Sequence, residues 1–216
     1  MSERGGVRHP VFARMYASSS ARVEAKGAAL HRRELLAGLT GRVLEVGAGN
    51  GLNFAHYPPT VRLVVAVEPE PHLRALAVES AAKAPVSVQV IGGLAEALPA
   101  QTASFDAGVA SLVLCSVGKP EAALGELFRV IRPGGELRFY EHVRATTPVL
   151  GPLLRLAEAS FWPLIAGGCH PARDTETAIG QAGFVIEALR EFRFSPSRPL
   201  PAIPHILGLA RRSEPG

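Results

Sequence analysis

Cysteine is scarce in this chain of 216 residues, which contains only Cys115 and Cys169. Two cysteines cannot form the disulfide framework that stabilises many small secreted domains. No second cysteine or histidine pair stands at the spacing that is typical of zinc sites. We therefore expect a reducing, cytoplasmic setting and no bound metal.

Long apolar runs are also missing. The first twenty residues contain no continuous apolar segment of the kind found in a signal peptide, and prolines and charged residues interrupt the apolar stretch 149–166. We expect neither a signal peptide nor an N-terminal anchor, and no stable membrane insertion.

Aromatic residues make up only 6% of the chain, and none form a stacking platform among the arginines. This pattern argues against nucleic-acid binding. The net charge is +4, and the positive surplus lies in the first 42 residues. A solvated helix face explains such a surplus, and attraction of an anionic substrate or a lipid headgroup is the alternative.

What the chain does have is a regular alternation of short apolar runs with helical segments. With 47% hydrophobic residues, its length suits one well-buried domain. The alternation predicts a parallel sheet with helices on both faces. Strands are expected at 42–46, 62–67, 86–91, 105–111 and 136–141, and helices at 53–56, 71–83 and 120–131, with a short turn at 96–98.

The two ends of the chain depart from this alternation. Residues 19–39 predict one amphipathic helix within an N-terminal helical cap segment, residues 1–40, that precedes the main domain, residues 41–216. Helices are expected at 148–166 and 174–182, so that residues 143–175 would form a lid. Segments 183–194 and 205–212 predict a terminal strand pair.

A glycine-rich loop follows the first predicted strand. Gly47, Gly49 and Gly51 stand at alternate positions after Val46, where glycine lets the backbone turn sharply and approach a ligand. A helix beginning near Leu52 would direct its positive dipole end at that ligand. The spacing G-x-G-x-G differs from the dinucleotide pattern G-x-G-x-x-G, which disfavours an NAD-dependent oxidoreductase.

An acidic residue, Glu68, ends the second predicted strand and is followed by Pro69. A carboxylate at this place can accept hydrogen bonds from both hydroxyls of a ribose. The glycine loop and Glu68 together predict a site for a nucleoside-containing ligand.

In these two motifs the chain resembles the class I methyltransferases that use S-adenosylmethionine (SAM). Further matches are the segments 93–99, 104–106 and 129–135, in the order that the family has them. The resemblance implies an α/β fold with a Rossmann-like seven-stranded sheet, mostly parallel with an antiparallel terminal strand, helices on both faces and a helical lid. It also implies SAM as cofactor and S-adenosylhomocysteine as product.

Most cofactor-binding residues are assigned by their places in these motifs. Ser111 is expected to contact the methionine portion of SAM because it ends the fourth predicted strand, and Tyr16 is expected to cap that portion, with anchoring of the N-terminal segment as the alternative. Family members often carry an aspartate for adenine where this chain has Leu94, so the amide of Ala95 or the side chain of Glu96 would have to substitute. The residues assigned to the cofactor are Tyr16, Glu45, Gly47, Ala48, Gly49, Gly51, Glu68, Pro69, Leu94, Ala95 and Ser111.

Two histidines are candidates for catalysis. Methyl transfer is an in-line displacement that mainly requires alignment and exclusion of water, but an oxygen or sulfur acceptor must also lose a proton. His142 follows the fifth predicted strand, and His170 lies on the turn Gly167-Gly168-Cys169. We expect His142 to act as general base and His170 to contact the acceptor, with structural roles as the alternatives.

Three strings, residues 111–117, 141–143 and 168–169, resemble the branch of the family that contains small-alkyl-thiol methyltransferases. This resemblance implies a small-molecule acceptor with a thiol or a hydroxyl. An N- or C-methyltransferase of specialised metabolism or of a lipid headgroup, and a SAM-binding protein without activity, are the alternatives. Abundant arginine and alanine with few lysines indicate a bacterial gene.

Overall fold

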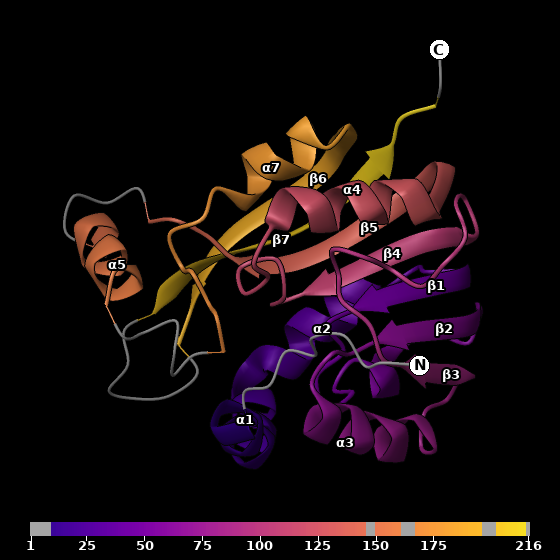
Figure 1. Ribbon diagram of the computed structural model, residues 1–216, viewed down its shortest axis with the longest axis horizontal. Helices are drawn as coiled ribbons and strands as arrows, with labels where there is room; N and C mark the ends of the chain where they lie inside the picture. Colours follow the sequence, from indigo (N-terminus) through magenta and orange to yellow (C-terminus); the bar gives the residue numbers. More distant parts are fainter. Residues whose placement is uncertain (1–9, 146–149, 161–166, 196–201, 215–216) are drawn as a thin grey trace.

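A computed structural model describes residues 10–145, 150–160, 167–195 and 202–214 of the chain. Seven strands form one sheet in the order β3-β2-β1-β4-β5-β7-β6 (Figure 1). The first five strands are parallel, β7 is antiparallel to β5, and β6 is antiparallel to β7. The strands are β1 (Gly41–Val46), β2 (Val61–Val67), β3 (Val88–Ile91), β4 (Phe105–Ser111), β5 (Ile131–His142), β6 (Phe184–Phe194) and β7 (Ile203–Arg212).

Helices cover both faces of this sheet and create two buried cores (Figure 1). On one face, α4 (Pro120–Val130) and α7 (Thr175–Gln181) pack through Leu124, Leu127 and Ile179. On the other face, α2 (Ala29–Leu36) and α3 (Pro71–Ala81) contribute Leu35 and Ala77. The expected seven-stranded methyltransferase fold with a terminal antiparallel pair is thereby confirmed.

The strand β5 begins earlier than the sequence indicates. It starts at Ile131 instead of residue 136, because the segment Pro133-Gly134-Gly135 lies within the strand and not in a turn before it. The register with β4 shifts between Phe105 and Ala107 to accommodate this irregular start.

The single helix expected at residues 19–39 is wrong in its form. The segment instead comprises α1 (Pro10–Val23), a π-helical turn (Glu24–Ala28) and α2. Gly27 causes the break because its φ of 118° lies outside the helical region, where only glycine is unstrained. Short π segments often occur at functional sites, and this one borders a cavity described below.

The short helix expected at 53–56 is present as a 3₁₀ helix (Phe54–His56), and no α-helix follows the glycine loop within the described residues before β2. Pro58 and Pro59 come soon after this turn, so the chain has no room for an α-helix before β2. The ligand site near the loop therefore receives no α-helix dipole from this segment.

Part of the expected lid lies within the described residues. Helix α5 (Leu150–Glu158) occupies the first part of the segment 148–166, and residues 161–166 lie outside the described part. Asp174 caps α7 by accepting a hydrogen bond from the Thr177 amide at 3.3 Å. In the described ranges, every helix is too short or too polar to cross a membrane.

Candidate active site

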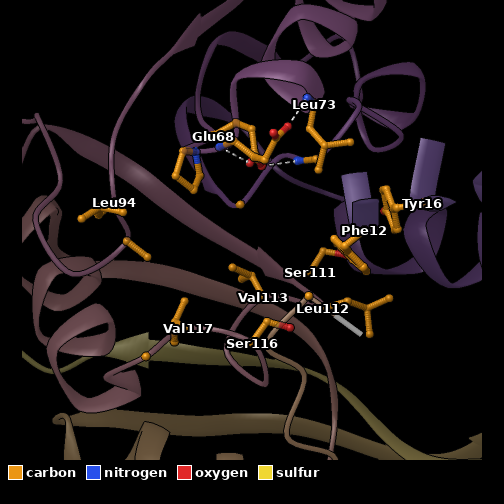
Figure 2. A pocket seen from close by; sticks show the side chains of 18 of the residues that line it. Phe12, Tyr16, Glu68, Leu73, Leu94, Ser111, Leu112, Val113, Ser116 and Val117 are labelled. Carbon is orange, nitrogen blue, oxygen red and sulfur yellow. Dashed lines mark hydrogen bonds between the residues drawn. The ribbon is translucent and has the colours of Figure 1, made fainter. Parts of the chain in front are cut away.

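A cavity of about 440 Å³ opens at the C-terminal ends of β1, β2 and β4 (Figure 2). This is the edge at which ligands bind in open parallel sheets. Glu68 lies across the cavity from the segment Ser111–Val117, with Leu94 toward one end and Tyr16 toward the other. The lining includes Phe12, Tyr16, Gly47, Gly49, Glu68, Pro69, Leu94, Ala95, Ser111, Leu112, Val113, Gly168 and His170, and we call it the donor cleft.

The glycine loop forms the floor of the donor cleft. Gly47 and Gly49 have φ values of 62° and 57°, which side-chain-bearing residues rarely adopt. A Cβ atom on Gly47 would lie 2.3 Å from Val113 Cγ2, and one on Gly49 would lie 3.4 Å from the Tyr16 ring. Bare backbone is therefore required at both positions. Ala48 and Gly51 are buried and do not line the cleft.

Glu68 is the principal charged group of the donor cleft. Its two carboxylate oxygens accept hydrogen bonds from the amides of Gly49 at 2.7 Å and Glu70 at 2.9 Å. Each oxygen retains a second lone pair for a ligand hydroxyl. Burial raises the pKa of Glu68 to about 7, although these two amides favour the ionised form.

Leu94 and Ala95 line the cleft where the family resemblance places adenine, and Pro69 lines it beside Glu68. The Glu96 carboxylate also lines the cleft, but it already accepts hydrogen bonds from the amides of Gly118 at 3.1 Å and Lys119 at 3.4 Å. Its capacity to replace the missing aspartate is thus partly used within the protein.

Glu45 differs from its expected place. It is 1% exposed, does not line the donor cleft, and accepts hydrogen bonds from Asn53 Nδ2 at 2.8 Å and the Tyr57 hydroxyl at 2.7 Å. Burial raises its pKa to about 7, against the opposing effect of these two donors. Its contacts fix the segment after the glycine loop and leave it no direct path to a ligand in the cleft.

Arg32 is a buried residue that the sequence analysis missed. Its guanidinium contacts Glu24 Oε1 at 2.9 Å, Asn53 Oδ1 at 2.8 Å and Ser111 Oγ at 3.1 Å. One side chain therefore joins the N-terminal segment to the glycine-loop region and to the end of β4. On an amphipathic helix an arginine is normally read as solvent-facing, so the sequence carried no signal for this contact.

A second cavity, of about 200 Å³, adjoins the donor cleft and shares Tyr16 and Leu112 with it. Leu112 has a φ of 58°, a strained value that a side-chain-bearing residue adopts mainly at functional sites. The other lining residues include Val23, Glu24, Ala28, Arg32, Tyr140, His142, Phe194 and His205.

Two histidines meet at the wall of the second cavity. The rings of His142 and His205 lie 4.5 Å apart between centroids. Burial, together with the neighbouring His142, lowers the pKa of His205 to about 3, so that this ring is neutral at physiological pH. The two expected catalytic histidines are separated, because His142 faces the second cavity and His170 faces the donor cleft.

His142 also contacts both cysteines of the chain. Its Nδ1 atom lies 3.5 Å from Cys115 Sγ and 3.4 Å from Cys169 Sγ, and the two sulfur atoms are 3.8 Å apart. We call these three residues the Cys-His cluster. The contact with Cys169 and burial raise the pKa of the Cys115 thiol well above its usual value. The sequence indicated no such grouping, because the three residues come from separate segments.

Hydrogen bonds to backbone groups hold the segments of the Cys-His cluster together. The buried Glu141 carboxylate accepts hydrogen bonds from the amides of Val113, Leu114 and Cys115 at 2.9, 2.9 and 3.2 Å. The amide of His170 donates to the Cys115 carbonyl at 2.7 Å, and Arg173 donates to the Leu114 carbonyl at 2.6 Å. The turn after residue 167 is thus fixed to the loop that follows β4.

The fold and the ribose-type carboxylate beside a glycine loop define a class of enzyme, the SAM-dependent methyltransferases. A family profile described as a methyltransferase domain matches residues 44–139. A SAM-dependent methyltransferase from Thermotoga maritima superposes with a TM-score of 0.70 at 20% identity, over 94% of this chain and 99% of that one. This structural likeness supports the fold.

Sequence comparison places the chain more narrowly. It is 35% identical over 180 residues to the human thiol S-methyltransferase TMT1B, covering 81% of this chain and 73% of the relative. It is 34% identical over 179 residues to human TMT1A, covering 81% and 72%. The chain is a SAM-dependent methyltransferase and belongs to the family that contains TMT1A and TMT1B.

Proposed function

We propose that this enzyme transfers the methyl group of SAM to a small thiol that binds in the second cavity. The observation that carries the proposal is that Tyr16 and Leu112 line both cavities. A donor in one cavity and an acceptor in the other would therefore be neighbours at these two residues. The names of the relatives TMT1A and TMT1B, thiol S-methyltransferases, support a sulfur acceptor.

The donor cleft fits SAM. Gly47 and Gly49 adopt positive φ values in the loop that lines the cleft, where the amino-acid portion would lie against bare backbone, and Glu68 has free lone pairs for the ribose hydroxyls. Ser111 and Tyr16 would contact the methionine portion, and Leu94 with Ala95 would contact adenine. SAM supplies an activated methyl group, and the protein aligns it with the acceptor and excludes water.

The acceptor is placed beside His142, at the wall of the second cavity. His170 lies on the donor side and would close the cleft near the methyl-bearing part of SAM. A thiol suits this arrangement because its ordinary pKa, about 8.5, leaves a fraction ionised at neutral pH, which an alcohol does not have.

The cellular setting is part of the proposal. Both cysteines are free and lie close together, which is consistent with a reducing compartment such as the cytoplasm. The composition, rich in arginine and poor in lysine, supports a bacterial source. In this view the cap expected at residues 1–40, of which residues 1–9 lie outside the described part, covers the cavities through its described residues, since Tyr16 lines both cavities and Arg32 lines the second.

An acceptor screen tests the reaction. The enzyme is incubated with methyl-labelled SAM and parallel sets of small aliphatic thiols, phenols, amines and carboxylates, and products are identified by mass spectrometry. We expect methyl thioethers to form with kcat/KM at least about tenfold above that of any other set, equivalent to about 1.4 kcal/mol. Exclusive methylation of amines or of carbon would contradict the proposal.

A cavity-filling variant tests the place of the acceptor. Val23 lines the second cavity, whereas Val11 lies on the same helix and is 81% exposed. Val23→Trp should abolish thiol methylation and leave SAM binding intact, because the indole occupies only the acceptor cavity. Val11→Trp is the matched control and should retain activity. Equal turnover in both variants would show that the acceptor binds elsewhere.

A further inference from the structure

We propose that Cys115, His142 and Cys169 form a three-ligand site for Zn²⁺, with a fourth coordination position open to the acceptor thiol. The proposal departs from the expectation that the chain binds no metal. The metal site itself is inferred from the geometry of the three ligands. Only the role of the fourth position, binding the acceptor thiol, rests on the proposed thiol methylation.

The spacing of the three ligand atoms matches three corners of a tetrahedral zinc site. With zinc–sulfur bonds near 2.3 Å and zinc–nitrogen bonds near 2.0 Å, a regular tetrahedron places two sulfurs about 3.8 Å apart and a sulfur and a nitrogen about 3.5 Å apart. The cluster has 3.8 Å between the sulfurs, and 3.5 and 3.4 Å from the sulfurs to His142 Nδ1. All ligand atoms lie within 4.8 Å of one another.

The donor set suits zinc in its chemistry as well as its spacing. Two thiolates and one imidazole are ligands that Zn²⁺ prefers, and sites with three protein ligands keep a position for water or substrate. The buried Glu141 carboxylate accepts a hydrogen bond from the Cys115 amide at 3.2 Å and so helps to position this ligand.

The Cys-His cluster lies between the two cavities. His142 lines the second cavity, while Ser116 and Gly168, the neighbours of the two cysteines, line the donor cleft. A ligand at the fourth position would therefore stand where acceptor and donor meet. A metal at this location could take part in the reaction, unlike a structural metal that lies far from the substrates.

The chemistry at the fourth position balances without a further reactant. The acceptor thiol binds Zn²⁺ as thiolate and releases its proton to solvent. Its sulfur then forms a bond to the methyl carbon, the bond from that carbon to the SAM sulfur breaks, and the electron pair remains on S-adenosylhomocysteine. In this proposal His142 holds the cation, and this role replaces the general-base role expected from the sequence.

Metal content is the first test. The full chain, purified without chelators, should contain about one zinc per molecule by elemental analysis, since a preorganised cluster of this kind retains zinc. The double variant Cys115→Ser/Cys169→Ser should lose at least about tenfold in zinc content while SAM binding by calorimetry shows that it still folds. His170→Asn removes the histidine beside Cys169 that lies outside the cluster, and should keep its zinc.

Cobalt substitution is the second test. Co²⁺ in place of zinc should give a thiolate-to-cobalt absorption band, and a small thiol should shift this band while a phenol of similar size should not. A chain that takes up neither zinc nor Co²⁺, or that contains a Cys115–Cys169 disulfide by mass spectrometry, would overturn the metal site. A cobalt spectrum that thiols do not change would overturn the role of the fourth position. Zinc binding without methylation of any thiol would instead show that the proposed function is wrong.

Discussion

The donor cleft and the second cavity, proposed for the acceptor, are constructed in different ways, and we call them the donor side and the acceptor side. The glycine loop and the principal carboxylate of the donor side come from residues 47–70 at the ends of β1 and β2, and Tyr16, Leu94 and Ser111 are among the residues that complete its lining. The acceptor side collects side chains from α1, α2, β5, β7 and the turn near residue 169, which are far apart in the sequence. The first arrangement depends chiefly on the sheet and the loops at its strand ends, whereas the second depends on how the terminal segments pack.

This difference has a consequence for variation. All members of the class use SAM as donor, so the glycine loop and the carboxylate that ends the second strand must suit the same ligand. Few substitutions should therefore be tolerated on the donor side. The acceptor side can change its chemistry by exchanging side chains on segments that cover the sheet. If the two sides are separate, a substitution on one side should leave the function of the other side unchanged.

Glu68→Ala should have the largest effect, and only on the donor side. The change removes the acceptor for two hydrogen bonds that the ribose hydroxyls would donate to a charged carboxylate, each contributing roughly 1.5–3 kcal/mol, so SAM affinity should fall by at least about 100-fold. Isothermal calorimetry measures the loss. Glu79→Ala, an exposed glutamate on α3, is the control and should bind normally. Unchanged affinity in Glu68→Ala would refute the donor site.

Arg32→Ala should affect the junction between the two sides. Removing a buried cation leaves Glu24 and Asn53 without their partner, which should lower the free energy of unfolding by about 3 kcal/mol. Denaturant unfolding followed by circular dichroism measures the change. Arg33→Ala, at the exposed neighbouring position, should cost less than about 0.5 kcal/mol. Equal losses in the two variants would show that the buried network contributes nothing particular.

The pH dependence of SAM binding sharpens the same comparison. The pKa of Glu68 is raised to about 7 by burial, and ribose hydroxyls donate to its ionised form. Below pH 7 binding must therefore remove a proton, and affinity should fall about tenfold for each pH unit, while above pH 8 this contribution is constant. Glu68→Gln should lack this component of the profile. A variant that keeps the wild-type slope would assign the titration to another group.

The sequence could indicate that the glycine loop and Glu68 lie together, because both signals are local and the Glu68 carboxylate accepts the Gly49 amide. A glycine loop after an apolar strand, and an acidic residue ending the next strand, are contiguous patterns whose geometry follows from the sheet. Glu45 shows the limit of that reasoning. It belongs to the same motif, but its carboxylate is directed at Asn53 and Tyr57 and does not reach the cleft.

The acceptor side could not be predicted because its contacts depend on packing. His142 is the last residue of β5, Cys115 follows β4 and Cys169 lies in the turn after residue 167. Hydrogen bonds from His170 and Arg173 to the loop after β4 hold these segments together. No spacing rule describes ligands drawn from three such segments. The break at Gly27 likewise depends on tertiary packing, which overrides the helical pattern of residues 19–39.

Asp106→Asn should have the smallest effect on stability and activity, because it changes the end of the parallel strands opposite to the two cavities. Asp106 lies at the start of β4, where its carboxylate accepts the Arg42 amide at 2.7 Å and pairs with Arg132 at 2.8 Å. An amide side chain keeps one acceptor oxygen and loses a half-exposed ion pair, so stability should fall by about 1 kcal/mol or less. SAM affinity and thiol turnover should be unchanged, since no contact of Asp106 reaches either cavity. A loss of SAM affinity would mean that the two ends of the parallel strands are coupled, and the donor side would then depend on more than the loop and Glu68.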